Sequence, residues 1–156
     1  MGFSFGTKAE TLESLKPFFK KACFCDQVYF TVREWKEKRE RLIEAILGRF
    51  DGNSLAVRSS AQGEDGFDSS MAGAYSSVIG VKPEGTALIS GVEEVTASYK
   101  TENGKNHVLV QPVVENVVIA GVVLTRDLDT GSPYYTINYD DSTGRTDTVT
   151  SGEAEN

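Results

Sequence analysis

The residues best suited to chemistry lie in one short stretch of the chain. Arg58 stands in the middle of an apolar run, 54–60, and is followed by two serines and a glycine-containing loop over 61–73. A guanidinium group offers a forked set of donors that fits phosphate oxygens. Backbone N–H groups of a glycine-rich loop can close over the same anion. The pattern is therefore compatible with a phosphate-binding site.

A structural role for Arg58 explains the same residues equally well. An arginine in an apolar strand is costly to bury alone, so it needs a carboxylate partner or an anionic ligand. Glu64 and Asp65 follow closely enough to supply that carboxylate and to pin the loop. The residues by themselves leave both interpretations open.

Several other kinds of site are disfavoured. His107 is the only histidine, which argues against a histidine-based metal centre. It also lies far from any serine motif of the kind that a catalytic triad uses, so we expect a structural role for it. Cys23 and Cys25 are too close in sequence for an ordinary disulfide, and we expect two reduced thiols. The common glycine-rich nucleotide-binding patterns are absent.

Composition is that of an ordinary globular protein. The chain has 156 residues, of which 39% are hydrophobic and 25% charged, with a formal net charge of −7. This length predicts one domain over 1–156. The acidic balance argues against binding to nucleic acid or to an anionic membrane surface. The start of the chain lacks a signal peptide pattern and no apolar run is long enough to span a membrane, so we expect a cytoplasmic protein.

Helices are expected early and strands late, which predicts an α+β fold. A helix over 8–15 should end near Pro17, and a Thr31–Glu34 capping box should start another that runs to Leu47. A further helix should begin at Pro83. The expected strands are 27–31, 54–60, 75–81, 107–114, 117–125, 133–139 and 145–150, the last four as an antiparallel meander.

Four segments together resemble one known family. They read Ala-Val-Arg-Ser-Ser-Ala-Gln-Gly-Glu-Asp over 56–65 with Ser-Met-Ala-Gly over 70–73, Phe-Gly-Thr-Lys-Ala-Glu-Thr-Leu over 5–12, Val-Leu-Val-Gln-Pro-Val-Val over 108–114 and Ala-Gly-Val-Val-Leu-Thr-Arg-Asp over 120–127. They resemble, in the right order, the N-terminal nucleotide-binding domain of phosphoenolpyruvate synthase and pyruvate phosphate dikinase. That domain has the ATP-grasp fold, so the resemblance implies an ATP-grasp first lobe: a mixed or antiparallel sheet with two or three packed helices.

The resemblance also implies residue roles. Arg58 is the implied catalytic residue, contacting the β- and γ-phosphates of ATP, and Lys8 should reach the phosphates from the N-terminal side. Thr125, Arg126 and Asp127 are expected to fix strand ends rather than to touch nucleotide. The other implied ATP-binding residues are Ser70, Ala72 and Gly73 in the loop over the phosphates, Ser77 near them, and Gln111, Pro112, Val113 and Val114 around the adenine. Lys8 as a solvated helix-start lysine and Gln111 as a core amide remain open alternatives.

Departures from the family pattern point to a divergent branch. Thr7 replaces the second glycine of the family's Gly-Gly pair, Leu128 replaces a proline, and the segment 139–152 replaces a Gly-Leu-Gly-Glu element. These changes put pyruvate as the ordinary substrate in doubt. They suggest an acceptor such as an amino acid amide, as in glutamine kinases of capsule loci.

The implied function is the ATP-binding portion of an ATP-dependent phosphotransferase. ATP and Mg²⁺ are the implied ligands, with the metal-binding residues expected outside this chain. The implied partners are the second lobe and a phosphohistidine domain, both absent here, so we expect the isolated chain to be inactive. A kinase that phosphorylates its substrate without a histidine relay, and a non-catalytic nucleotide-binding or interaction module, are the alternatives.

Overall fold

The chain is α+β, as predicted, and divides into two compact units. The computed structural model describes residues 6–62, 75–100, 104–127, 129–144 and 149. The two units are Met1–Val113 and Val114–Asn156, and each is described here by itself. That 1–156 forms a single domain stays a prediction.

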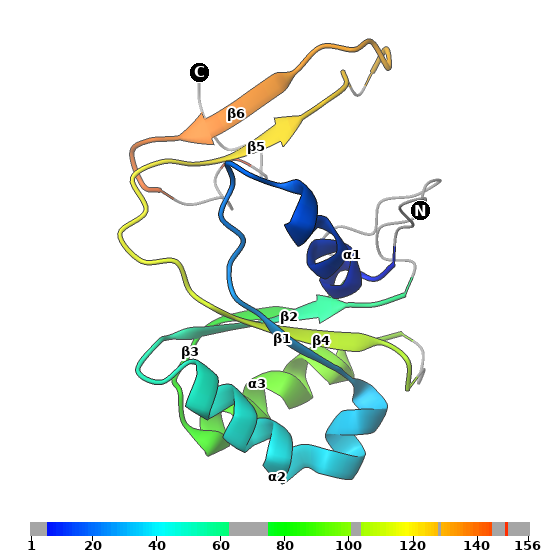
Figure 1. Ribbon diagram of the computed structural model, residues 1–156, viewed down its shortest axis with the longest axis vertical. Helices are drawn as coiled ribbons and strands as arrows, with labels where there is room; N and C mark the ends of the chain where they lie inside the picture. Colours follow the sequence, from blue (N-terminus) through cyan, green and yellow to red (C-terminus); the bar gives the residue numbers. More distant parts are fainter. Residues whose placement is uncertain (1–5, 63–74, 101–103, 128, 145–148, 150–156) are drawn as a thin grey trace. The chain divides into compact units, whose positions relative to one another are not determined.

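The first unit is built on a four-stranded antiparallel sheet. Its strand order is β1-β4-β2-β3, and helices α2 and α3 lie on one face while α1 lies on the other (Figure 1). The elements are α1 Lys8–Leu15, η1 Lys16–Phe18, β1 Val28–Thr31, α2 Val32–Arg49, β2 Leu55–Ser60, β3 Ser77–Val81, α3 Gly85–Ala97 and β4 His107–Pro112.

Alternation along the strands decides which side chains enter the core. Successive strand residues point to opposite faces, and the apolar set of one face packs against α2 and α3. That set shares near-complete burial, and consists of Phe30, Leu55, Val57, Val81, Val108 and Val110 from the strands with Trp35, Ile46, Leu88, Val92 and Val95 from the helices. The side chains on the opposite face of the same strands are therefore not part of this core.

The helix starts follow from local hydrogen bonding. The predicted capping box is confirmed: Thr31 Oγ1 accepts from the Glu34 N–H at 3.1 Å, and the Glu34 carboxylate accepts from the Thr31 N–H at 2.8 Å. Thr7 and Glu10 form a second capping box at the start of α1. Pro17 lies in η1, directly after α1, and so ends the α-helix as expected.

The second unit contains one hairpin. Strands β5 (Ala120–Leu124) and β6 (Thr136–Asp140) pair in antiparallel register. Asp127 closes the connection, because its Oδ1 accepts from the N–H and the hydroxyl of Thr130 at 2.8 and 2.7 Å. Arg126 Nη1 donates to the Gly131 carbonyl at 3.0 Å. These bonds support the expectation that this segment fixes strand ends.

The predicted meander is wrong in its first step. β4 pairs with β1 and β2 rather than with β5, because Val108 and Val110 are buried in the helix-covered core of the first unit. The β5–β6 pair agrees with the prediction, and the expected strand 145–150 lies outside the described residues except for residue 149. No described helix is long and apolar enough to cross a lipid bilayer.

Candidate functional site

Arg58 lies on the sheet face opposite α2 and α3. Its neighbours Val57 and Ser59 alternate with it, and Val57 belongs to the helix-covered core. Arg58 is exposed, so the burial cost expected for it does not arise. The sequence showed an apolar run around Arg58 but not that one face of β2 is open. Ser77 of β3 is its direct partner across the ladder, so both side chains project from the same open face.

Gln111 lies on this open face too. It pairs with Ala56, two residues along β2 from Arg58. No hydrogen bond from the Gln111 side chain is found within the described part of the chain, which does not support the core-amide alternative. Pro112 is the last residue of β4. The N–H of Val113 donates to the Ser54 carbonyl at 2.7 Å, so the chain stays next to β2 for one more residue. Val114 is 59% exposed and begins the second unit.

Lys8 is the first residue of α1, and α1 is bound to the other end of the open face. The Ala9 N–H donates to Ser60 Oγ at 2.9 Å. Thr7 Oγ1 and His107 Nδ1 share a hydrogen bond of 3.2 Å. Since Ser60 and His107 are paired across β2 and β4, the start of α1 is held at this rung of the ladder. The structure thus brings the backbone of Lys8 to the same face as Arg58.

Three of the predicted ATP-binding residues belong to a loop outside the described ranges. Ser70, Ala72 and Gly73 lie outside the described residues, as do Glu64 and Asp65, the two carboxylates that could pair with Arg58. Within the described ranges no carboxylate forms an ion pair with Arg58. The structural alternative for Arg58 therefore depends on residues beyond those ranges.

Two carboxylates that interact electrostatically with His107, those of Glu10 and Glu34, take part in helix capping. The Thr7 N–H donates to Glu10 Oε2 at 2.8 Å, and this bond lowers the pKa of Glu10. The Thr31 N–H likewise lowers the pKa of Glu34. Both groups stay ionised at neutral pH, but their charge is already directed at backbone N–H groups.

Magnesium does not fit the strand residues of the open face. Mg²⁺ is bound in proteins through carboxylates together with waters and phosphate oxygens. The described open-face residues are Tyr29, Thr31, Ala56, Arg58, Ser60, Ser77, Ile79, His107, Leu109 and Gln111, and they include no carboxylate. A magnesium ion at this face would need ligands from elsewhere.

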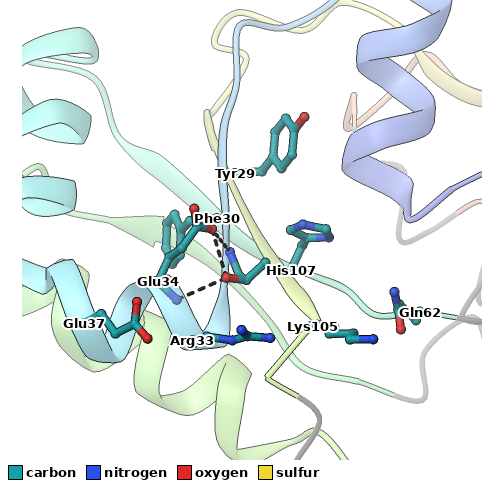
Figure 2. Close-up of a pocket in the computed structure, with 9 residues that line it drawn as sticks. Tyr29, Phe30, Arg33, Glu34, Glu37, Gln62, Lys105 and His107 are labelled. Atoms are coloured by element: carbon teal, nitrogen blue, oxygen red, sulfur yellow. Dashed lines mark hydrogen bonds between the residues drawn. The ribbon is translucent and has the colours of Figure 1, made fainter.

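A pocket of about 710 Å³ opens beside the His107 end of the sheet (Figure 2). Figure 2 shows Arg33, Lys105 and Gln62 along one rim. The Glu34 carboxylate accepts from the Thr31 N–H at 2.8 Å and from the Thr31 hydroxyl at 2.9 Å. The full lining is Tyr29, Phe30, Thr31, Arg33, Glu34, Glu37, Gln62, Lys105 and His107. It includes none of the predicted nucleotide residues and mixes both signs of charge, so the open face and not this pocket is the better candidate.

The sequence reasoning missed the residues that hold α1 on the sheet. Thr7, Ser60 and His107 make these contacts, yet only the fold shows that they meet. One signal was available: Thr7 and Glu10 have the same Thr-x-x-Glu spacing as Thr31 and Glu34.

The structure defines an α+β domain whose sheet is packed against α2 and α3 on one side and carries Arg58, Ser77 and Gln111 beside α1 on the other (Figure 1). A comparison with protein-family models adds the particular identity. The model described as the pyruvate phosphate dikinase AMP/ATP-binding domain matches residues 7–155, and the chain belongs to this family. In a direct comparison, no curated protein matches the sequence. The predicted resemblance to this AMP/ATP-binding domain is thereby confirmed.

Proposed function

We propose that the open face of the four-stranded sheet binds ATP, with Arg58 at the β- and γ-phosphates. The observation that carries this proposal is the register of β2, β3 and β4. It puts Arg58, Ser77 and Gln111 on the face of the sheet that α2 and α3 do not cover, and α1 brings Lys8 to one end of it. A family that binds AMP and ATP needs such a polar surface.

The order of residues along the face suits an elongated nucleotide. Lys8 and His107 lie at one end, Arg58 in the middle and Gln111 at the other end. His107 and Gln111 are four positions apart along β4, which places their α-carbons about 13 Å apart at the usual strand rise. This is comparable to the long dimension of an extended nucleoside triphosphate. Adenine would lie at Gln111, Pro112, Val113 and Val114, with the phosphates toward Lys8.

Arg58 has the chemistry that phosphoryl transfer requires. The departing phosphoryl group spreads negative charge over its oxygens, and catalysis is mostly positioning and electrostatic stabilisation. Arg58 stands on a strand, where it is the register partner of Ser77, and its forked guanidinium can donate to several phosphate oxygens at once. In the whole enzyme we propose that ATP transfers its β,γ-pyrophosphoryl group to a histidine of another domain and releases AMP. Water then removes the outer phosphoryl group as phosphate, and the acceptor takes the remaining one from the histidine. Magnesium would neutralise part of the phosphate charge, held by residues outside this chain.

An ATP titration followed by amide chemical shifts tests the proposal. Trp35 is a poor reporter because it is 2% exposed within the helix-covered core, so the backbone signals of 56–60, 77–79 and 109–111 are the readout. We expect shifts confined to this face. Replacing Arg58 by alanine should weaken ATP binding about tenfold or more, since a hydrogen bond to a charged group contributes roughly 1.5–3 kcal/mol.

Two further variants sharpen the result. Arg58→Lys keeps the charge but loses the forked geometry, so it should recover only part of the ATP affinity. Arg41→Ala removes an exposed positive charge from α2, which covers the opposite face, and should leave the affinity nearly unchanged. If Arg41→Ala and Arg58→Ala lowered the ATP affinity equally, the effect would come from net charge alone and the proposed site would be refuted.

A further inference from the structure

Lys8 stands between two anchored residues. On one side Thr7 Oγ1 is 3.2 Å from His107 Nδ1, and on the other the Ala9 N–H donates to Ser60 Oγ at 2.9 Å. Ser60 and His107 are direct partners in the β2–β4 register. The two residues that flank Lys8 are thus tied to one rung of the ladder.

The bond at Ala9 satisfies a group that the helix itself leaves unpaired. The first N–H groups of an α-helix have no partner within the helix. Ser60 and Ala9 are both 0% exposed, so water is excluded from this N–H and an acceptor is needed. The Ala9 carbonyl is held as well, since Gln27 Nε2 donates to it at 3.2 Å. Both backbone groups of Ala9 are therefore fixed by residues outside α1.

The rung that carries these anchors is itself held in place. Tyr99 Oη accepts from the Ser60 N–H at 3.3 Å and donates to the His107 carbonyl at 2.5 Å. The His107 ring also packs edge-on against Tyr29, with 5.4 Å between ring centroids. Ser60 and His107 can thus act as a rigid base for the start of α1.

We propose that Ser60 and His107 are positioning residues, which set Lys8 against Arg58 for the terminal phosphates of ATP. This rests on the proposed function. Arg58 lies two residues before Ser60 on the same face, about 6.6 Å along β2. Fixing the backbone on both sides of Lys8 removes part of the ordering cost that a long flexible side chain otherwise adds to binding. The anchors at Ser60 and His107 would therefore raise the affinity for nucleotides with terminal phosphates relative to AMP.

Ser60→Ala tests this role by comparing ATP with AMP. The change removes the acceptor for Ala9 and leaves Arg58 and the strand backbone in place. We expect the dissociation constant for ATP to rise about tenfold and that for AMP to stay within about twofold. Val92→Ala is the control, because it destabilises the helix-covered core and touches neither this rung nor α1. It should lower the unfolding midpoint and keep the ratio of ATP to AMP affinity.

A double-mutant cycle with Lys8→Ala separates positioning from general damage. If Ser60 acts through Lys8, then Ser60→Ala should have little further effect on ATP affinity once Lys8 is replaced. His107→Phe keeps a ring against Tyr29 and loses the bond to Thr7, so it gives a second variant with the same expected outcome.

Two results would overturn the inference in distinguishable ways. Equal weakening of ATP and AMP by Ser60→Ala, or an effect that adds fully to that of Lys8→Ala, would refute the positioning role and leave the ATP site standing. Wild-type ATP affinity in both Lys8→Ala and Arg58→Ala would instead refute the proposed function, and the positioning role with it.

Discussion

Gly6 and Thr7 explain why this chain departs from its family's Gly-Gly pair. Thr7 caps α1 and contacts His107, two roles that a glycine could not fill. A side chain at Gly6 would disturb the capping carboxylate, because its Cβ would lie 2.6 Å from Glu10 Oε2 and 3.0 Å from Glu10 Cβ. The threonine substitution is therefore a local stabilisation of the helix start that carries Lys8.

Gly6→Ala should destabilise the protein by about 1 kcal/mol, the usual cost of losing a helix cap. The new methyl group would displace the Glu10 carboxylate from the Thr7 N–H, and urea unfolding measures the change. Gly48→Ala is the control: it lies in α2 with open space around its Cβ position, so it should stabilise by about 0.5–1 kcal/mol. The same sign for both variants would contradict the explanation.

Glu34 makes stability depend on pH in the acid range. Its pKa is lowered from 4.5 by the Thr31 N–H first and the Thr31 hydroxyl second. A lowered pKa in the folded state means that the unfolded chain binds the proton more readily, so this contribution is complete above about pH 4.5 and is lost as pH falls through the lower folded value.

Glu34→Gln should therefore flatten the acid limb of the stability curve. Thermal unfolding midpoints measured from pH 7 to pH 3 should fall less steeply in this variant than in the wild type. Glu44→Gln removes an exposed carboxylate from the same helix and is the control, with the wild-type slope expected. An unchanged slope in Glu34→Gln would show that the capping carboxylate does not contribute.

At the scale of elements, β2 serves two purposes through its alternation. Leu55 and Val57 complete the core, while Arg58 and Ser60 serve the open face from the same strand. Fully burying one such aliphatic side chain contributes about 1.5–3 kcal/mol. The core residues therefore fix the register, and a shift of one residue would turn Arg58 into the core.

The β5–β6 hairpin depends on a close approach at Gly121. A Cβ there would lie 2.5 Å from the Asn138 carbonyl oxygen and 3.0 Å from Tyr139 Cβ. Because the first of these atoms is backbone, we expect Gly121→Ala to separate the two strands, with loss of cross-strand NOE contacts between 120–124 and 136–140. Val123→Ala, which trims a side chain that is 57% exposed, should keep those contacts. Intact contacts in Gly121→Ala would refute this reading of the hairpin.

At the scale of the whole molecule, the two units should differ in local stability. β4 is hydrogen-bonded to strands on both sides, and Val108, Leu109 and Val110 are 0% exposed. The β5–β6 pair is a two-stranded sheet on its own, a form that is marginally stable in water. Local opening is easier where few apolar side chains are buried.

Native-state hydrogen exchange on the full chain measures this difference. We expect the amides of β4 to exchange at least about 100-fold more slowly than those of β5 and β6, which corresponds to about 2.8 kcal/mol in opening free energy. The amides of β2 that pair with β4 serve as the reference for the first unit. Equal protection in β4 and β5 would show that the hairpin is stabilised as strongly as the sheet.

Local signals in the sequence determined the helices, most strands and the family. The Thr31–Glu34 box, Pro17 and the spacing of Leu88, Val92 and Val95 act over a few residues, so they could be read directly. The motif around Arg58 indicated a nucleotide-binding domain for the same reason, and the family match agrees with it.

Tertiary structure decided what depends on contacts between distant residues. β4 joins β1 and β2 because its valines belong to a core assembled from helices far away in sequence. Arg58 is exposed because it lies on the face of β2 away from α2 and α3, whereas Ser60 on the same face is buried at α1. Thr7, Ser60 and His107 meet because β2 and β4 pair in one register beneath α1. Hydrophobic burial sets that register and no local pattern records it, which is why the sequence predicted the residues of the candidate site but not how the fold brings them together.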